Sequence, residues 1–585
     1  MMRGKRLVGL AVASGMLSGA FAACGGGGGS NGSDAGDAGA RDSSVASDGA
    51  VETTPQCQAQ GGTAAVAQPT FVRNIKTGET AWYASPAVVD LDKNGSKEIV
   101  APFYSTFVFD AQGNKLSTGK ATGGRVYAPG VVADLDGDGT MEVVVGGSDG
   151  TTQGTSVAAY EWKGGALSVK AGWPASTCSG GQCPEVRGMA GSDLDGDGTI
   201  EVVVTTTNTS NTGAQVFVFE PNGTVRAGWP RYDQTDDLTF NGEGNQGYGC
   251  YGENVGIGNI DDDAQLEILV TYDNHQINAF KADGSSILAS DWYKNPSSQY
   301  FGNRMGWGQF IRWFDPTVED NHYHYDPNGS WPSVDTTMWL QWTASPPNVV
   351  DVDGDGKNEV VGIPNAEQYQ PYETQGYAFM VLQGAQSGGA NAARRLPSFD
   401  TLPFSDKPAV RASGDWYPPS GIPAPTTVSI LGDGKPELVA PINDGYVYAI
   451  GPDGSRLWRY DYAKGYAKTF ASEVVVADLN KDGTPELVFG TYSDQPDGGH
   501  LVVLENTGAL LYDITLPNQG TNGNGIGIPA APTIADLDGD GQLEIVVSTF
   551  DHGMDVFTVP GSGTSCMLWP TGRGSYLRAG RPISP

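Results

Sequence analysis

The chain has 585 residues, of which 84 are glycine and six are cysteine, and its formal net charge at pH 7 is −33. A protein this acidic repels nucleic acid and anionic lipid, so nucleic acid is not expected among its partners. Contact with a membrane is expected only through a covalently attached lipid. Beyond the N-terminal region the sequence has no sustained helical period and no apolar segment long enough to span a bilayer, and its short Val- and Ile-rich runs predict an all-β protein with many turns.

Residues 1–23 have the pattern of a bacterial secretion signal. A basic start is followed by an apolar stretch from Leu7 to about Leu17 and then by small residues up to Cys24. This ending resembles the lipobox, in which the cysteine is lipidated and becomes the first residue of the mature protein, although Phe21 stands where the lipobox most often has Leu. Ordinary cleavage with an unmodified Cys24 is the alternative.

Residues 24–63 are rich in Gly, Ser, Asp and Ala and have no apolar periodicity, which predicts a flexible tether. As a random coil, roughly 40 such residues would hold a folded domain about 35 Å from a membrane. We therefore expect a lipid-anchored protein of the bacterial cell envelope, at the outer membrane or cell surface.

The folded part, predicted to span 64–585, contains eight copies of the pattern Asp-x-Asp-x-Asp-Gly-x-x-Glu, each followed by a run of Val, Ile or Leu. The copies start at Asp90, Asp134, Asp193, Asn259, Asp351, Ser429, Asp478 and Asp536, at intervals of 44 to 92 residues. A repeat of this period predicts an array of similar small units.

Each intact copy offers the oxygen atoms that a calcium ion prefers. Side chains at positions 1, 3 and 5 converge when the chain curls, the glycine permits the curl, and the glutamate at position 9 closes the shell. An EF-hand closes at position 12 and is flanked by helices, so it does not fit, and the absence of soft ligands argues against zinc or copper. We expect about six to seven calcium ions, held by Asp90, Asp92, Asn94 and Glu98; Asp134, Asp136, Asp138 and Glu142; Asp193, Asp195, Asp197 and Glu201; Asn259, Asp261, Asp263 and Glu267; Asp351, Asp353, Asp355 and Glu359; Asp478, Asn480, Asp482 and Glu486; and Asp536, Asp538, Asp540 and Glu544.

Two copies are degenerate. In the copy that starts at Asn259, Ala264 replaces the glycine, and whether it binds an ion is open. In the copy that starts at Ser429, only Asp433 and Glu437 remain, and we expect a turn without metal.

The copies, with preceding segments such as Ser85-Pro86-Ala87 and Ala531-Pro532-Thr533, resemble the FG-GAP or VCBS repeat over nearly all of residues 80–560. That family builds the calcium-bearing β-propeller of integrin α-subunits and of many exported bacterial proteins. The resemblance implies one four-stranded blade per repeat and calcium ligands at positions 1, 3, 5 and 9. Eight copies predict eight blades, or seven if one copy lies in a distorted blade, and the segment 70–74 is the candidate strand that closes the ring.

The cysteines agree with export. Cys178 and Cys183 are expected to form a disulfide across a tight loop. In a closed ring Cys57 and Cys566 come close enough to pair, but the connectivity among Cys57, Cys250 and Cys566 stays open.

An aromatic-rich insertion occupies about 287–345, in the longest interval between copies. Long insertions in repeat arrays often form the binding face, which makes its tryptophans candidate ligand-binding residues. They are Trp307, Trp313, Trp331 and Trp339. The alternative is that they fill a small satellite core.

No motif of a hydrolase nucleophile, metalloprotease or phosphate loop occurs in the sequence. We therefore expect a non-catalytic binding or adhesion module for a protein or glycan ligand. A carbohydrate-active enzyme, similar to the polysaccharide lyases that use a calcium-rich propeller, is the alternative.

Overall fold

The structure is a computed structural model that describes residues 51–62, 65–120, 122–148, 156–210, 213–231, 249–272, 277–290, 307, 313–314, 338–367, 376–401, 403–406 and 418–582. All of them belong to one compact unit, Gly36–Pro585. None of its described helices is both long and apolar enough to cross a membrane. The signal segment and Cys24 lie outside the described residues.

The repeating unit is an antiparallel sheet in which an acidic loop joins the first strand to the second. In the first sheet β2 (Ala87–Val89), β3 (Glu98–Pro102), β4 (Thr106–Asp110) and β5 (Lys115–Gly119) pair in chain order. We call each Asp-rich loop between the first and second strands an acidic corner. β2 and β3 are entirely buried, which explains why their sequences are continuous apolar runs and do not alternate.

The following sheets repeat this order along the chain. They contain β6 (Val131–Ala133), β7 (Glu142–Gly146), β8 (Val157–Lys163) and β9 (Ala166–Val169); β10 (Val186–Ser192), β11 (Glu201–Thr206) and β12 (Val216–Phe219); β13 (Val255–Gly258), β14 (Glu267–Thr271) and β15 (Ile277–Phe280); β18 (Asn348–Val350), β19 (Glu359–Gly362) and β21 (Met380–Gln383); and β22 (Thr426–Val428), β23 (Glu437–Ile442), β24 (Tyr446–Ile450) and β25 (Arg456–Asp461). The last two contain β26 (Thr469–Ala471), β27 (Val475–Ala477), β28 (Glu486–Ser493), β29 (His500–Leu504), β30 (Leu510–Thr515), β31 (Ile526–Gly527) and β35 (Met567–Trp569); and β32 (Thr533–Ala535), β33 (Leu543–Thr549), β34 (Gly553–Val559) and β1 (Thr70–Ile75).

A small further sheet and two short helices complete the described elements. The sheet consists of β16 (Trp313–Phe314), β17 (Met338–Gln341) and β20 (Asn365–Glu367), and the 3-10 helices are η3 (Ser387–Gly389) and η4 (Pro397–Phe399).

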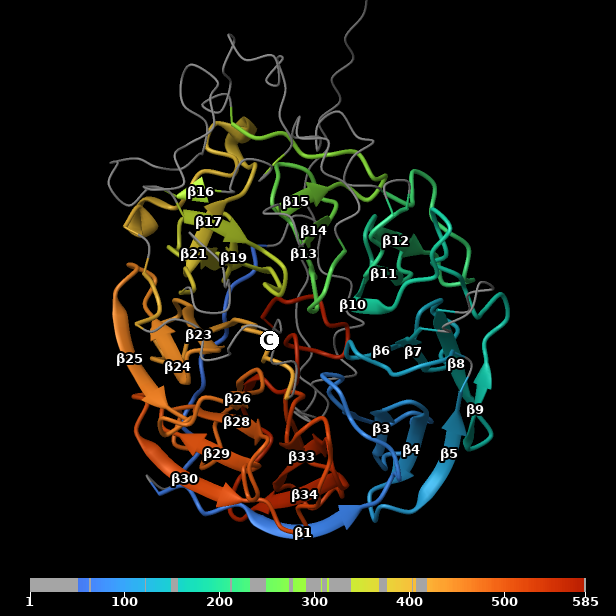
Figure 1. Cartoon of the computed structure of the whole chain (residues 1–585), viewed down its shortest axis with the longest axis vertical. Helices are drawn as coiled ribbons and strands as arrows, with labels where there is room; N and C mark the ends of the chain where they lie inside the picture. Colours follow the sequence, from blue (N-terminus) through green and yellow to red (C-terminus); the bar gives the residue numbers. More distant parts are fainter. Residues whose placement is uncertain are drawn as a thin grey trace, which may run out of the picture. The chain divides into compact units, whose positions relative to one another are not determined.

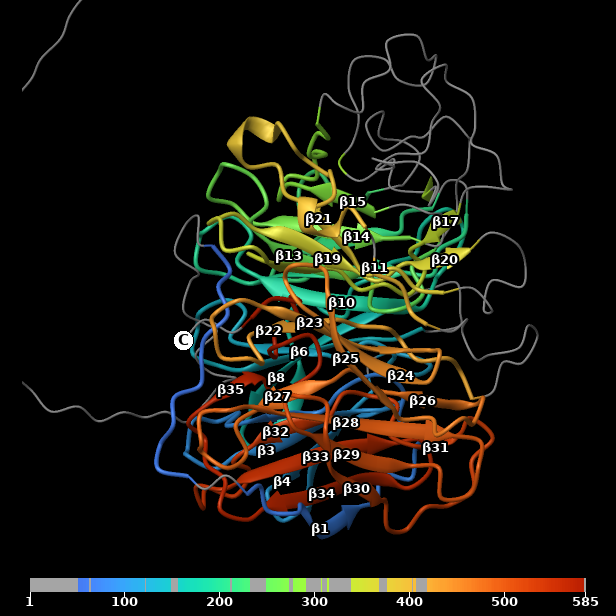
Figure 2. The same cartoon turned by 90° about the vertical axis from the view of Figure 1, so that its left-hand side faces the viewer.

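The sheets follow one another around a central axis and close into a β-propeller (Figures 1 and 2). First strands of neighbouring sheets contact each other at β6–β10, β10–β13, β13–β18, β18–β22 and β27–β32, and β2 contacts β32 at the seam. β1 pairs antiparallel with β34, so a strand from the start of the chain completes the last blade, as the sequence predicted.

The prediction of eight four-stranded blades is wrong. Among the described residues, seven corner-bearing sheets take their strands in chain order, with β1 added to the last sheet and β35 to the sheet before it. β10–β12 and β13–β15 have only three strands each. The sheet around the Asp351 corner is distorted, because the chain leaves it in β20, which pairs with β17, and returns in β21. The propeller therefore has seven regular blades, which is the alternative that a distorted copy allows.

The inner edges of the first strands are covered by the C-terminal segment, which runs through the middle of the ring (Figure 1). Backbone N–H groups of Ile534, Val132, Gly191, Ile257 and Val349 donate in turn to carbonyls of Pro570, Tyr576, Leu577, Ala579 and Gly580. Because an unpaired strand edge leaves its amides unsatisfied, this segment binds the blades to one another at the axis.

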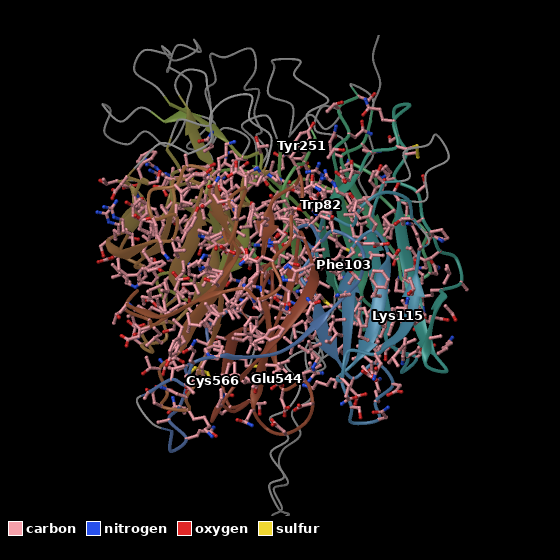
Figure 3. All side chains as sticks on the ribbon, turned by 60° about the horizontal axis from the view of Figure 1, so that its bottom comes forward. Trp82, Phe103, Lys115, Tyr251, Glu544 and Cys566 are labelled. Carbon is pink, nitrogen blue, oxygen red and sulfur yellow. A yellow bond between two sulfur atoms is a disulfide. The ribbon has the colours of Figure 1, made fainter. Side chains whose placement is uncertain are left out.

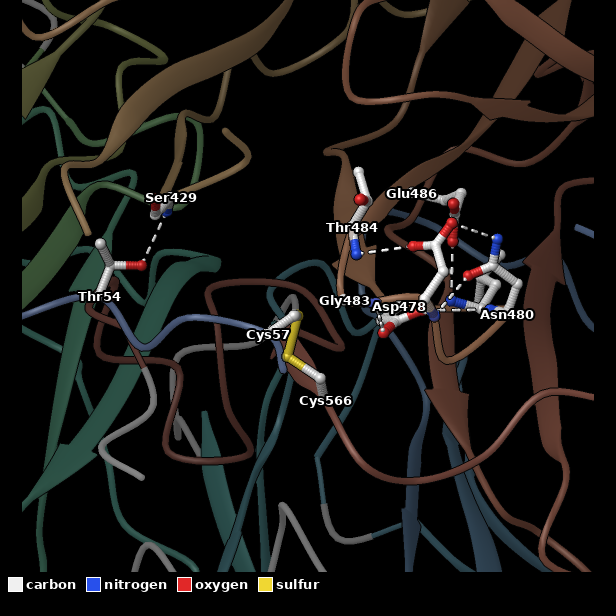
Figure 4. Close-up of a disulfide and its surroundings, with 11 residues drawn as sticks. Thr54, Cys57, Ser429, Asp478, Asn480, Gly483, Thr484, Glu486 and Cys566 are labelled. Atoms are coloured by element: carbon white, nitrogen blue, oxygen red, sulfur yellow. Dashed lines mark hydrogen bonds between the residues drawn. A yellow bond between two sulfur atoms is a disulfide. The ribbon is translucent and has the colours of Figure 1, made fainter. Parts of the chain in front are cut away.

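The seam is also secured from the N-terminal side, where part of the predicted tether is packed. Cys57 forms a disulfide with Cys566 (Figure 4), and Glu52 and Thr54 are buried. The Thr54 hydroxyl accepts a hydrogen bond from the Ser429 N–H at 2.8 Å. Residues 52–57 of the predicted tether therefore pack against the propeller.

A buried histidine lies where β1 meets β34. His552 contacts the carboxylates of Asp551 at 2.7 Å and Asp555 at 2.9 Å, and Asn74 of β1 donates to Asp555 at 2.9 Å. Burial alone would lower the pKa of His552, but hydrogen bonds to the two carboxylates outweigh it and raise the pKa to about 9. A protonated imidazole therefore neutralises two buried acids at the closing strand.

We predict that His552→Gln destabilises the propeller by on the order of 3 kcal/mol near pH 6, because it leaves two buried carboxylates without a cation. Since the folded-state pKa is raised above the ordinary value of 6.5, the wild-type contribution is complete below pH 6.5 and is lost as pH rises through about 9. Denaturant unfolding between pH 6 and pH 10 measures this. His500→Gln, which changes a partly exposed histidine on β29, is the control. Parallel pH profiles for wild type and His552→Gln would contradict the prediction.

Candidate metal centres

The glutamate at position 9 begins, or in β33 nearly begins, the second strand of every corner-bearing sheet. In all eight corners its Oε2 accepts the backbone N–H of the residue at position 2, at 2.7 to 3.0 Å. The carboxylate thus ties the start of the corner to the strand that leaves it. Its buried position follows from the strand register, because it pairs with the last residue of the first strand, as Glu98 pairs with Val89.

The aspartate at position 1 stabilises the tight turn of the corner by accepting hydrogen bonds from backbone amides later in the loop. In the Asp134 corner, Oδ2 accepts the N–H of Gly139 at 2.9 Å, and Asp138 Oδ1 accepts the N–H of Thr140 at 2.7 Å. Gly139 has a φ of 88°, a conformation that a side chain disfavours, which explains the glycine at position 6. The same bond from position 6 recurs at Asp90, Asp193, Asp351, Asp478 and Asp536.

This geometry brings predicted ligands together. Ligand atoms of at least three acidic residues lie within 4.8 Å of one another in the groups Asp90, Asp92 and Glu98; Asp134, Asp136 and Glu142; Asp193, Asp195 and Asp197; Asp261, Asp263 and Glu267; and Asp351, Asp353 and Asp355. These groups could therefore hold metal ions.

The carboxylates fit a divalent cation on two further observations. Asp134 Oδ1, in an intact corner, is buried and accepts no hydrogen bond within the described structure. Burial, with the neighbouring Asp353 and Asp351 charges, raises the pKa of Glu359 to about 9. Because a buried anion without a partner is costly, a cation coordinated by these oxygens would stabilise the ionised corner.

Basic side chains from outside the loop, which the sequence reasoning missed, approach three corners. Lys170 Nζ lies 2.7 Å from Asp136 Oδ2 and 3.1 Å from Glu142 Oε1, and Arg226 contacts Asp195 in the same way. Both residues directly precede the sequence Ala-Gly-Trp-Pro. This repeat of a basic residue followed by Ala-Gly-Trp-Pro was the signal from which their shared position could have been predicted. The third residue is Lys281.

The degenerate Ser429 corner is closed by its own hydrogen bonds. The Ser429 hydroxyl accepts the N–H of Gly434 at 3.0 Å, and Leu431 is 49% exposed at the position of a ligand. The prediction that it is a turn without metal stays a prediction.

The predicted aromatic insertion lies largely outside the described residues. Trp307 and Trp342 are fully buried in one apolar cluster with Leu269, Ile277 and Val349, so Trp307 exposes no ring surface to a ligand. Trp331 is not among the described residues, and only the backbone of Trp313 and Trp339 is described, in β16 and β17, which pair.

Of the cysteines, Cys178 and Cys183 form a disulfide, as do Cys57 and Cys566. Cys250 is buried outside both disulfides.

Comparisons with known proteins show only distant likenesses in fold. No family model matches the chain, and no curated protein matches it. Among solved structures, it is similar to the Dos1 propeller, with a TM-score of 0.44 and 10% identity over 85% of this chain and 95% of that one. It is also similar to the exotype rhamnogalacturonan lyase YesX (TM-score 0.35, 14% identity, 85% of this chain and 86% of that one) and to quinohemoprotein alcohol dehydrogenase from Comamonas testosteroni (TM-score 0.33, 12% identity, 85% and 76%). Likenesses at this level carry no argument about activity.

We predict that Glu359→Gln abolishes stabilisation by divalent cations at its corner, because the amide keeps the size of the side chain but removes the charge. Ion binding at a hundredfold excess over Kd stabilises a folded state by about 2.7 kcal/mol. Thermal unfolding with cation and with chelator measures the difference. The matched control is Glu437→Gln in the Ser429 corner, which should respond to cation as wild type does. Equal responses of both variants would contradict the prediction.

Proposed function

We propose that the chain is an exported, calcium-stabilised β-propeller of the FG-GAP type that acts as a non-catalytic binding module at the bacterial cell surface. The observation that carries the proposal is the repeated acidic corner, in which the same carboxylate contacts recur around the ring. A protein whose corners are tied by ions becomes rigid only where calcium is plentiful, as it is outside the cell.

Calcium is the proposed ion because the donors are carboxylate oxygens in a flexible loop, supplemented by backbone carbonyls. Magnesium demands a stricter octahedron and keeps more of its water. The two disulfides support an oxidising compartment.

The proposed ligand-binding surface is the connection face, the end of the blades where first strands begin. Figure 3 shows Trp82 and Tyr251 toward the end opposite Glu544 and Cys566. The guanidinium of Arg125 stacks on Trp82 at 3.8 Å from the ring centroid, and that of Arg187 stacks on Tyr127 at 3.9 Å. The rings of Trp82 and Tyr127 are themselves buried, at 6% and 7% exposure, so the groups open to a ligand are the partly exposed guanidinium groups stacked on them. Arginine is enriched at binding hot spots, which supports this choice of surface.

Arg125 and Arg187 are held in place by the same acid. The Glu185 carboxylate accepts hydrogen bonds from Arg125 at 2.6 Å and from Arg187 at 2.5 Å, so both guanidinium groups are oriented before a ligand binds. Preorganisation of this kind lowers the entropic cost of binding. The axis of the ring is occupied by the C-terminal segment 570–581 (Figure 1).

We expect that glycan and peptide arrays probed in calcium identify a ligand whose binding falls at least tenfold in Arg187→Gln. Lys115→Gln, an exposed substitution on the outer strand β5, should bind as wild type does. Unchanged binding in Arg187→Gln would contradict the proposed position of the binding surface. New reducing ends or unsaturated products after incubation with polysaccharides would show that the protein is an enzyme and contradict the non-catalytic role.

We propose membrane attachment through Cys24, on the strength of the lipobox-like sequence that precedes it. Cys24→Ala should transfer the protein from the membrane fraction to the soluble fraction, and mass spectrometry of the wild-type N-terminal peptide should find an acylated cysteine. Wild-type protein in the soluble fraction with an unmodified Cys24 would contradict the anchor.

A further inference from the structure

The corner that starts at Asn259 has a different backbone from the others. In the seven other corners, the residues at positions 4 and 6 both have positive φ, as Gly137 (69°) and Gly139 (88°) do. Neither Asp262 nor Ala264, which occupy these positions here, is among the positive-φ residues. Because a Cβ atom disfavours the left-handed region, Ala264 removes the curl that aims the amide of position 6 at the first ligand.

The side chains of this corner are engaged differently as well. Asn259 donates its Nδ2 to the carbonyl of Asp263 at 2.7 Å, whereas the aspartates of intact corners accept amides at this position. Asp262 turns away from the corner and accepts the N–H groups of Ser387 at 2.7 Å and Gly388 at 2.6 Å. The first ligand position therefore supplies no carboxylate, and the loop is anchored to η3.

A lysine ammonium lies between the remaining acids. Lys281, the residue after β15, places Nζ 2.6 Å from Asp261 Oδ2 and 2.5 Å from Asp263 Oδ2. The residues paired with the corner glutamate in the first two blades are acidic, namely Asp110 opposite Glu98 and Glu161 opposite Glu142. A calcium ion needs its oxygens at about 2.3 to 2.6 Å. It cannot share these two oxygens with an ammonium already at that distance.

We propose that Lys281 is the resident cation of the Asn259 corner and that this corner takes no divalent ion. The proposal rests on the proposed calcium binding of the intact corners and refines it. The charges of the two kinds of corner support this exchange. An intact corner with four carboxylates and a divalent ion has a net charge of −2. The Asn259 corner, with three carboxylates at its ligand positions and the ammonium of Lys281, has the same net charge. Because the ammonium belongs to the chain itself, the blade formed by β13–β15 can assemble without calcium.

Lys170 and Arg226 do not play this part. Their corners keep the positive-φ glycines and the bond from position 6 to Asp134 or Asp193. They also keep all four carboxylates, so two aspartates of each corner lie outside the contacts of the basic side chain: Asp134 and Asp138 beside Lys170, and Asp193 and Asp197 beside Arg226.

Hydrogen exchange of the full chain, with calcium and with EGTA, tests the proposal. Peptides covering 259–271 should keep their protection in EGTA, whereas peptides covering 351–362 should lose it by at least tenfold. Equal loss in both regions overturns the role of Lys281 and leaves calcium binding intact. No loss in either region overturns the proposed calcium binding and this proposal together.

Ion counting on a rebuilt corner provides the second test. The triple variant Asn259→Asp, Ala264→Gly, Lys281→Gln restores the intact pattern and should bind one more calcium per chain than wild type by elemental analysis. Lys170→Gln is the matched control and should leave the count unchanged. An unchanged count in the folded triple variant, or a wild-type count that already includes this corner, overturns the proposal.

Discussion

One buried contact organises the blades: the carboxylate of the corner glutamate accepts the amide of the second corner residue in every copy. The contact fixes the register between the first two strands, because a slip of one residue would turn the glutamate away from the corner. It also places one carboxylate oxygen in a site where water is largely excluded. The geometry of each blade and the proposed cation sites of the intact corners therefore depend on the same residue.

Blades built in this way depend on their neighbours. Except for β27, which pairs with β28 and β35, each first strand has one edge that its own sheet leaves unpaired. The described C-terminal segment supplies carbonyls to several of these edges in succession. β1, the Cys57–Cys566 disulfide and the His552 cluster then secure the seam from the other terminus. Since a repeat array gains stability from interfaces, closing the seam brings both ends of the chain into the same cooperative unit.

The corners could be predicted from the sequence, but some of the contacts around them could not. The spacing from Asp134 to Glu142 predicts the turn and the start of β7, because position 9 must both face the corner and enter a strand. The departure of β20 could not be predicted, since its partner β17 belongs to an insertion with no repeat pattern. The packing of Cys57 was concealed by the composition of the preceding segment, which resembles a linker, and depends on Cys566 far along the chain.

Lys281 shows why residue type alone is insufficient at such a site. Its sequence neighbourhood is an ordinary hairpin turn, and only the pairing of β14 with β15 brings its ammonium to Asp261 and Asp263. The loss of a glycine at position 264 and the gain of a lysine at 281 are separated in sequence, yet they compensate each other in space. In the Asn259 corner Glu267 is buried beside two further acids, Asp261 and Asp263, whatever the loop does. In the proposed arrangement this blade keeps its shape because the ammonium of Lys281 stands beside these carboxylates where the intact corners would hold an ion.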